Sequence, residues 1–342
     1  MILVTGAAGF IGSNFVNSWF VDNEEGVISY DNLTYAGNLE NLEALKENKK
    51  HLFIKGDISD SKKLTRLLTE YKPRAVVNFA AESHVDRSIS SPKVFFETNV
   101  IGTYNLLESS KNYWENLERT SQENFLFLHV STDEVYGSLK KEQDKFKESN
   151  QYRPNSPYSA SKASSDHIIR SYYKTYGFPA VTSNCSNNYG PFQFPEKLIP
   201  MTILSLLGEK KVPLYGDGKQ IRDWIHVNDH CDALKILLEK SKVGEVYNIG
   251  GNNEMENLEV VKMICLSLDK KMPRKKNLKY VELISFVKDR AGHDQRYAID
   301  SSKAKIKLGW EAKKDFKIGI DQTIQWYLDN PKWVKNIVDR KS

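Results

Sequence analysis

ILVTGAAGFIG, residues 2–12, carries the strongest architectural signal in this chain. Its first four residues predict a buried strand, and the glycine-rich turn after them leads into a helix expected near residues 10–21. Glycine at positions 6, 9 and 12 permits a tight turn and lets a pyrophosphate approach the backbone, because no Cβ intervenes. The helix N-terminus adds free N–H groups and partial positive charge. The spacing is G-x-x-G-x-x-G rather than the commoner G-x-G-x-x-G, but the context predicts a dinucleotide site.

Working outward, apolar segments alternate with amphipathic ones through the first half of the chain. Strands are expected near 27–31, 52–55, 75–79, 125–130 and 180–183, and helices near 62–71, 94–113 and 158–176. Such alternation indicates a parallel sheet covered on both faces. After Tyr189 the predicted elements become shorter and prolines punctuate them. We predict an α/β fold: a Rossmann-type doubly wound parallel sheet over 1–185, a smaller C-terminal substrate-binding lobe over 186–330, and a tail over 331–342. A strand near 246–249 could rejoin the main sheet.

Composition narrows the class of protein. The 342 residues are 40% apolar, which suffices for a sizeable core, and 49 basic against 44 acidic residues leave a dispersed charge of +5 that does not argue for nucleic acid. We expect no membrane-spanning helix and no signal peptide. The three cysteines are far apart, so we expect neither a zinc site nor a disulfide framework, and a cytoplasmic location.

Acidic residues at two predicted strand ends refine the cofactor site. Asp31 ends the second strand about twenty residues after the glycine turn, where an acid binds the adenosine ribose hydroxyls. It would repel a 2′-phosphate, and no arginine stands beside it, so NAD is preferred to NADP. Asp57-Ile58 follows the third strand and is placed to edge the adenine. The alternative for either acid is a turn or cap.

Tyr158 and Lys162 stand four residues apart on the long predicted helix and therefore share one face. A nearby cation favours a phenolate, so this tyrosine could take a proton from a sugar hydroxyl while hydride leaves the carbon for NAD. Tyr-x-x-x-Lys is common by chance. Its position after the fifth strand of a dinucleotide fold is what favours a catalytic pair.

Two adjacent acids, Asp133 and Glu134, follow the predicted strand at 125–130. A surface turn would explain them simply, whereas a site needing an acid and a base would explain them chemically. Side chains alternate along a strand, so the pair must lie just beyond it, in a turn that lets both converge. Burial and a neighbouring like charge would raise the pKa of a carboxyl in this pair, which suits an acid, but the pattern does not say which residue is the acid and which the base.

With these motifs the chain resembles the extended short-chain dehydrogenase/reductases, and further stretches make it similar to the dTDP-glucose 4,6-dehydratases over residues 1 to about 330. These stretches are Ala80–Ser88, Ser131–Gly137, Asn187–Pro191, Pro195–Leu198 and Arg222–Trp224. The resemblance implies oxidation of dTDP-glucose at C4, loss of water across C5 and C6, and return of the hydride to C6. It also implies a homodimer and a product class that feeds deoxysugars such as rhamnose.

The resemblance assigns residues to roles. It makes Asp133 the acid, Glu134 the base and Thr132 a partner of the 4-hydroxyl, while Tyr158 and Lys162 form the oxidising pair; Asn99 either supports that helix or caps one. The implied cofactor residues are Gly6, Gly9, Phe10, Ile11, Gly12, Asp31, Asn32, Leu33, Thr34, Asp57, Ile58, Phe79, Ala80, Ala81, Ser83, Thr98, Tyr158, Lys162 and Asn188. The implied substrate residues are Glu82, Ser83, Thr132, Asn187, Lys197, Leu198, Pro213, Tyr215, Arg222, Asn257, Arg290 and His293. No metal is expected, and His84 and His129 are expected to be structural.

Three alternatives stay open. A 4,6-dehydratase for another nucleotide, such as UDP-glucose, would carry the same acids. A C4-epimerase or a decarboxylase shares the fold, although epimerases lack the acidic pair. A non-enzymatic NAD-sensing protein usually loses the tyrosine or the lysine, and both are present here.

Overall fold

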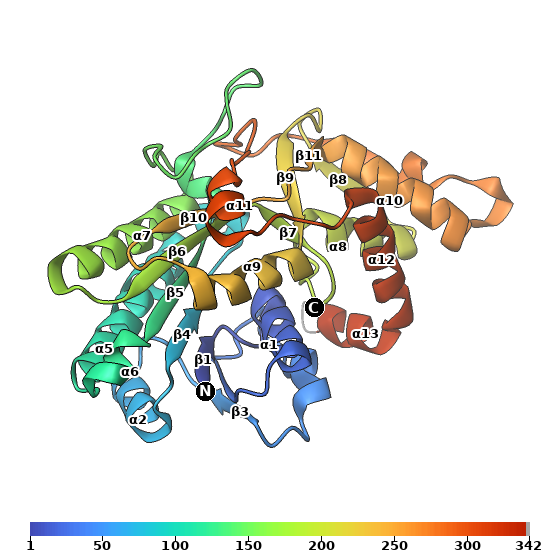
Figure 1. The fold of residues 1–342 in the computed structure, drawn as a ribbon. Helices are drawn as coiled ribbons and strands as arrows, with labels where there is room; N and C mark the ends of the chain where they lie inside the picture. Colours follow the sequence, from blue (N-terminus) through green and yellow to red (C-terminus); the bar gives the residue numbers. More distant parts are fainter. Residues whose placement is uncertain (340–342) are drawn as a thin grey trace.

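The computed structural model describes residues 1–339, and its centre is a seven-stranded parallel sheet (Figure 1). Neighbouring strands follow the order β10-β6-β5-β4-β1-β2-β3, and every adjacent pair is parallel. The strands are β1 (Ile2–Thr5), β2 (Val27–Asp31), β3 (His51–Lys55), β4 (Ala75–Asn78), β5 (Leu126–Thr132), β6 (Ala180–Cys185) and β10 (Val246–Ile249). The strand order reverses between β1 and β4, which is where doubly wound sheets bind ligands at their carboxyl ends. The expected Rossmann-type sheet is confirmed.

Side-chain alternation in β1 explains why both faces of the sheet are covered. Ile2 and Val4 enter one apolar core with α1 (Phe10–Asp22), α9 (Val227–Lys240) and α11 (Ser302–Leu308). Leu3 points the other way, into a core with α2 (Ser61–Tyr71), α5 (Thr103–Glu115) and α7 (Pro157–Tyr176). Figure 1 shows α1 and α9 next to each other on one side of the sheet.

The smaller lobe has its own core between two small sheets and several helices. One sheet has the order β11-β9-β7 and the other pairs β12 with β8. Its elements are β7 (Asn187–Tyr189), β8 (Val212–Tyr215), β9 (Ile221–His226), β11 (Glu254–Glu256), β12 (Ile284–Val287), α8 (Leu198–Leu207), α10 (Asn257–Lys271), α12 (Phe316–Asp329) and α13 (Pro331–Asp339). The remaining helices are α3 (Val85–Ser90), α4 (Pro92–Phe95) and α6 (Arg119–Glu123), with short 3₁₀ turns at η1 (Leu39–Leu45), η3 (Asp133–Tyr136), η4 (Lys275–Asn277) and η5 (Tyr280–Leu283).

The chain returns to the large sheet after entering the small lobe. β10 pairs with β6, and α9 and α11 pack in the core that α1 shares. Residues 186–330 therefore contribute to the core of the large sheet and to the core of the small lobe. A single domain boundary at residue 185 does not describe this arrangement. The predicted tail also differs, because Pro331–Asp339 forms a docked helix whose Trp333 Nε1 donates to Asn41 Oδ1 at 2.8 Å. Residues 340–342 of that prediction lie outside the described residues.

One predicted helix is not regular. Residues 94–113 are helical in part, but η2 (Phe96–Gly102) is a π-helical turn between α4 and α5. Such wide turns often occur at functional sites. Here the turn contains Thr98 and Asn99, and the Asn99 side chain is buried against Glu82 and Ser161.

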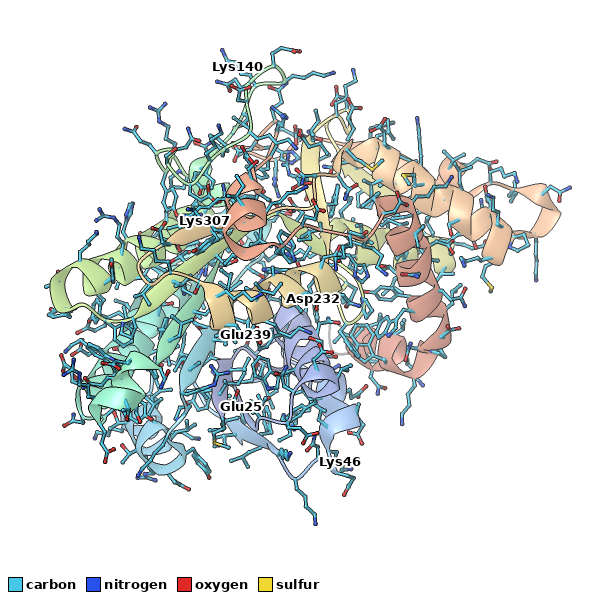
Figure 2. All side chains as sticks on the ribbon, viewed as in Figure 1. Glu25, Lys46, Lys140, Asp232, Glu239 and Lys307 are labelled. Atoms are coloured by element: carbon cyan, nitrogen blue, oxygen red, sulfur yellow. The ribbon has the colours of Figure 1, made fainter. Side chains whose placement is uncertain are left out.

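Charged side chains cover the periphery of the molecule, as Figure 2 shows for Lys46 and Lys140. No helix within residues 1–339 is long and apolar enough to cross a membrane. All three cysteines are buried and free.

Candidate active site

The glycine turn is shaped by close backbone contacts. Gly6 has a φ of +66°, and a Cβ there would lie 2.6 Å from Ala80 N, at the end of β4. A Cβ on Gly12 would lie 2.2 Å from Gly6 O. At Gly9 a Cβ would meet only Gly6 O, at 3.3 Å, so this position borders open space, and no side chain caps the α1 N-terminus that it begins. The uncapped N–H groups and the open glycine form a cradle that fits a pyrophosphate.

Asp31 fixes the edge of this cradle. Its two carboxylate oxygens accept hydrogen bonds from Ala8 N at 2.9 Å and from Leu33 N at 2.7 Å. Burial raises the pKa of Asp31, although both backbone donors oppose the shift. Asp31 therefore stabilises a turn through Leu33 N, which was the alternative to a cofactor role, and it also contacts the glycine turn through Ala8 N.

Asp57 lies at the end of the neighbouring strand β3. One of its oxygens accepts from Asn32 Nδ2 at 2.7 Å and the other from Ser59 N at 2.8 Å. Ile58 beside it is buried. The residues predicted to bind the adenosine, 31–34 after β2 and 57–58 after β3, therefore meet at the carboxyl ends of these two strands, next to the glycine turn. With Phe79 and Ala80 against Gly6, this places the predicted cofactor residues of four strands at one edge of the sheet.

The two acids lie just past their strand, as predicted. β5 ends at Thr132, and η3 begins at Asp133, with Thr132 Oγ1 accepting from Glu134 N at 3.3 Å. One oxygen of each acid, Asp133 Oδ2 and Glu134 Oε2, is shielded from solvent and has no hydrogen-bond partner among residues 1–339. Buried polar atoms are normally satisfied, so this pair fits a site that a substrate completes.

The surroundings of the two acids differ. Burial raises the pKa of Asp133 well above its usual value, and the negative charges of Glu134 and Asp223 reinforce this. Burial also raises the pKa of Glu134, but the positive charges of Lys197, Arg222 and Arg290 oppose the shift. The pKa of both acids is raised, but the three cations restrain the rise at Glu134, so the surroundings favour Asp133 over Glu134 as the proton donor, a distinction that the sequence alone left open.

Tyr158 and Lys162 occupy one face of α7, whose start is fixed by a capping box between Ser156 and Ser159. Lys162 Nζ donates to Val130 O at 2.9 Å. Burial, followed by the Glu134 charge, raises the pKa of Tyr158 well above its usual value, while the Thr132 hydroxyl opposes it. Lys162 is not among the leading influences on the Tyr158 pKa, so the expected lowering by Lys162 is not seen there. Burial lowers the pKa of Lys162 itself.

Buried polar residues brace α7 from behind. Asn99 Nδ2 donates to Ser161 Oγ at 2.8 Å, and its amide also bonds both Glu82 backbone groups, at 2.8 Å and 3.0 Å. Asn99 therefore supports the helix rather than capping one. His129 is fully buried against Asn78 and Lys162, and His84 caps α3 through Arg87 N, so both histidines are structural, as expected.

The predicted phosphate-binding arginines lie on the small lobe. Arg222 stacks on Tyr297, with its Cζ 4.3 Å from the ring centre, and its Nη2 donates to Asp294 O at 3.0 Å. Arg290 Nη1 is 3.3 Å from Asp86 Oδ1, while its Nε is buried without a partner among the described residues. Both arginines are thus held in place with donor capacity to spare.

The other predicted substrate residues lie around them. Lys197 Nζ donates to Ser83 O at 2.6 Å, Tyr215 donates to Asp86 at 3.1 Å, and His293 Nδ1 lies 2.6 Å from Asp289 Oδ1. Buried acceptor oxygens of Asn187 and Asn257 lack partners within the described chain. Asn188 is instead engaged with His230 at 2.9 Å, Leu198 begins α8, and Pro213 is an exposed residue of β8.

Some contacts had no signal in the sequence. Asp86 joins Arg290 and Tyr215 across the two lobes, and it was visible only as part of the 80–88 stretch. Tyr297 supports Arg222, but nothing in its local sequence marks it.

Comparison with known proteins gives consistent matches. The family model described as GDP-mannose 4,6 dehydratase matches residues 3–323. The chain is 56% identical over 337 residues to a dTDP-glucose 4,6-dehydratase of Xanthomonas campestris, covering 98% of this chain and 95% of the relative. It is 51% identical over 340 residues to one from Neisseria meningitidis, covering 99% and 96%.

Solved structures of two dTDP-glucose 4,6-dehydratases and of one epimerase are similar to this chain over nearly their full length. A dTDP-glucose 4,6-dehydratase from Bacillus anthracis, in complex with NAD, is similar with a TM-score of 0.86 and 47% identity, covering 98% of this chain and 99% of that one. One from Streptomyces venezuelae, also with NAD bound, has a TM-score of 0.89 and 41% identity over the same shares. A UDP-glucose 4-epimerase from Thermotoga maritima is similar at 30% identity and a TM-score of 0.83, covering 96% and 99%.

Proposed function

We propose, because the chain belongs to the dTDP-glucose 4,6-dehydratase family, that it converts dTDP-glucose to dTDP-4-keto-6-deoxy-glucose and water. The observation that carries the proposal is the pair Asp133 and Glu134. Each ends in a buried, unpartnered oxygen close to Tyr158, and more positive charges oppose the rise of the pKa at Glu134 than at Asp133. An oxidation and reduction at one carbon would need neither acid.

NAD is the proposed resident cofactor; when bound, it takes hydride from C4 and gives it back at C6. The glycine turn would hold its pyrophosphate, and Asp31 would take the adenosine ribose hydroxyls, with Asp57 and Ile58 beside the adenine. Asn32, Leu33 and Thr34 would line the ribose, and Phe79, Ala80, Ala81, Ser83, Thr98 and Asn188 the remaining length. Within residues 1–339, no arginine is among the groups that Asp31 contacts, which favours NAD over a cofactor with a 2′-phosphate.

The first proton transfer is proposed to involve Tyr158 and Thr132. Tyr158 accepts the proton of the 4-hydroxyl, and Thr132, which moves the Tyr158 pKa downward, orients that hydroxyl. Burial raises the pKa of this phenol, and the positive charge of Lys162 is proposed to favour its ionised form during the proton transfer.

The elimination is proposed to divide between the acids. The C4 ketone acidifies the C5 proton, which Glu134 removes, while Asp133 protonates the departing 6-hydroxyl. Glu134 is supported in the ionised state by Lys197, Arg222 and Arg290. Asp133 is supported in the protonated state by burial and by two neighbouring acids. General acid and base groups of this kind each contribute roughly 10²–10⁴ in rate.

Substrate recognition is proposed for the small lobe. Arg222 and Arg290 would bind the diphosphate, with Asn187 helping, and Lys197, Leu198, Pro213, Tyr215, Asn257 and His293 would border the nucleotide. Glu82 and Ser83 would face the sugar. The proposed division gives residues 1–185 the cofactor and residues 186–330 the substrate, with β10, α9 and α11 shared.

A homodimer in the cytoplasm is proposed on separate grounds. Apolar side chains stay exposed along α3 to α5, namely Ile89, Val94, Phe96, Ile101 and Tyr104. A row of this kind is typical of a surface that a second subunit covers.

The test is incubation of the purified protein with dTDP-glucose and, separately, UDP-glucose, without added NAD. We expect loss of one water from the dTDP sugar, measured by mass spectrometry, at a faster rate than from the UDP sugar. Faster loss from UDP-glucose would make UDP-glucose the substrate. A C4 epimer of unchanged mass would indicate an epimerase, and retention of NAD without any sugar chemistry would indicate a sensing protein.

A further inference from the structure

Asp166 continues the row that Tyr158 and Lys162 begin. The three residues are spaced four apart on α7, so they share one face of the helix. The side chain of Asp166 is 3% exposed, and neither the cofactor nor the substrate assignments use it. A carboxylate this deeply buried requires compensation.

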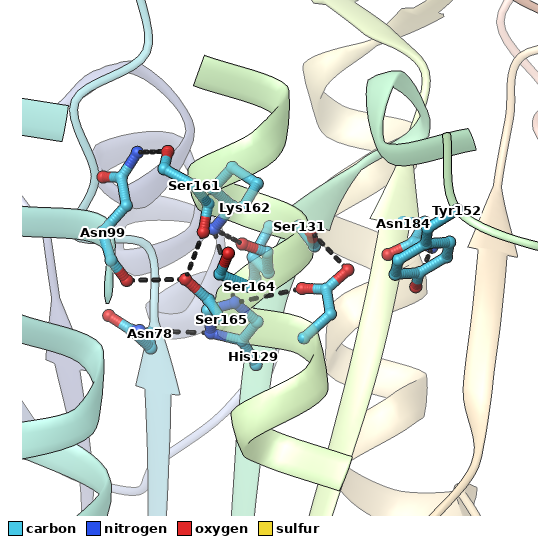
Figure 3. A network of polar contacts seen from close by, with 12 residues as sticks. Asn78, Asn99, His129, Ser131, Tyr152, Ser161, Lys162, Ser164, Ser165 and Asn184 are labelled. Atoms are coloured by element: carbon cyan, nitrogen blue, oxygen red, sulfur yellow. Dashed lines mark hydrogen bonds and ion pairs between the residues drawn. The ribbon is translucent and has the colours of Figure 1, made fainter. Parts of the chain in front are cut away.

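A short polar network through His129 connects Asp166 with Lys162. Figure 3 shows His129, Ser131 and Lys162 of this network. Ser131 Oγ donates to Asp166 Oδ2 at 2.9 Å. His129 Nε2 lies 3.4 Å from Asp166 Oδ1 and 3.4 Å from Lys162 Nζ. The carboxylate and the ammonium thus approach the same ring nitrogen from two sides, and Lys162 Nζ is anchored on Val130 O.

His129 does not neutralise Asp166. Its Nδ1 faces Asn78 Nδ2 at 3.2 Å, and Thr5 Oγ1 fixes the other end of that amide by donating to Asn78 Oδ1 at 2.7 Å. This network assigns the ring proton to Nε2. Burial, followed by the Lys162 charge, lowers the pKa of His129 to about 4, so the ring is neutral at physiological pH. Lys162 and Asp166 are then the two groups of opposite charge type that the neutral ring separates.

We propose that Asp166 is a positioning residue that keeps the Lys162 side chain cationic and in place beside Tyr158. The inference rests on the proposed function, in which that cation turns Tyr158 into a base. Burial penalises the charged form of Lys162, and Asp166 is the leading opposing influence. The titratable groups around this pair are Tyr158 on α7, His129 on β5, Cys185 on β6, Tyr136 on η3, and Tyr152.

The test compares Asp166→Asn, which preserves shape and removes the charge, with the wild-type protein across pH. Losing the carboxylate lets Lys162 deprotonate at lower pH, so the ratio of variant to wild-type kcat/KM for dTDP-glucose falls as pH rises and recovers at lower pH. Each unit by which the Lys162 pKa moves corresponds to about tenfold in that ratio above both pKa values. A merely structural defect would lower the ratio equally at every pH, and a flat ratio would overturn the proposal.

Acetylation of Lys162 gives a second readout that needs no turnover. Only the neutral amine reacts, so in Asp166→Asn the labelling rate at a given pH should rise by about tenfold for each unit of displacement, as measured by peptide mass spectrometry. Unchanged labelling would also refute the proposal. If the wild-type protein did not convert dTDP-glucose at all, the proposed function would fail, yet this labelling would still test Asp166.

Two control variants distinguish the effect of losing the Asp166 charge from a general effect on folding. Asp166→Glu keeps the charge and should restore a nearly flat ratio. Asp229→Asn removes another buried acid, which holds the backbone of Lys313 and Lys314, and should leave the Lys162 labelling unchanged. If Asp166→Asn does not fold, Ser131→Ala loosens the same carboxylate, and it should show a smaller pH-dependent fall; a flat profile there would equally contradict the proposal.

Discussion

Replacing Gly12 with alanine is expected to weaken NAD binding by a predictable amount. The new Cβ would lie 2.2 Å from Gly6 O and 3.0 Å from Ala7 Cα, and real Cβ atoms essentially never come within 3.0 Å of a neighbour. Because both neighbours are backbone, the turn itself must move by about 0.8 Å. Overpacking of this kind costs about 1–3 kcal/mol. If that cost falls on the cradle, NAD affinity drops by about 5-fold to 150-fold.

The assay is calorimetric titration of nucleotide-free protein with NAD, alongside thermal melting without NAD. Gly309→Ala is the control, because Gly309 also has a positive φ, of +71°, but a Cβ there meets nothing within 4 Å. It should lose about 1–2 kcal/mol of stability from left-handed strain and bind NAD normally. Wild-type affinity in Gly12→Ala would show that the turn does not hold the cofactor.

Three further outcomes are expected. Glu134→Gln should still reduce bound NAD when dTDP-glucose is added, seen as near-ultraviolet absorbance, but should lose roughly 10²–10⁴ in dehydration rate; near wild-type dehydration would remove Glu134 as the base. Asp133→Asn should raise the melting temperature at neutral pH and not at acidic pH. The folded-state pKa of Asp133 is raised, so the stability that Asp133 contributes is present below its unfolded pKa and is lost as pH rises through the folded value; an equal effect at both pH values in calorimetry would contradict this. Arg222→Gln should raise KM for dTDP-glucose by roughly tenfold or more with NAD affinity unchanged, and weaker NAD binding in titration would move Arg222 out of the diphosphate site.

Much of the fold could be predicted from local patterns. Apolar strands separated by amphipathic helices specify a parallel sheet, and Gly6, Gly9 and Gly12 mark its first crossover, because few other sequences permit that turn. The return of residues 227–249 to the large sheet was harder to predict. The local sequence of β10 or α9 does not show whether the core of the large sheet or that of the small lobe will bury it. That choice depends on how all the apolar surfaces of the chain pack together.

The placement of the proposed catalytic residues could be predicted from the sequence, but the electrostatic influences on them could not. Spacing placed Tyr158 and Lys162 on one face and Asp133 and Glu134 past a strand end. Which acid stays protonated depends on Asp223, Lys197 and two arginines that come from distant parts of the chain, so no local pattern reveals it. The same holds for Tyr158, because burial and the charge of Glu134 are the largest influences that raise the pKa of its phenol.

Turnover of dTDP-glucose in deuterated water tests the central claim most directly. If Glu134 removes the C5 proton, exchanges it with solvent and then protonates C5, while Asp133 protonates the departing 6-hydroxyl, NMR of the product will show a 4-keto-6-deoxy sugar carrying deuterium at C5. A product that has lost water without deuterium at C5, or a C4 epimer that has kept its 6-hydroxyl, would contradict the account of the two acids.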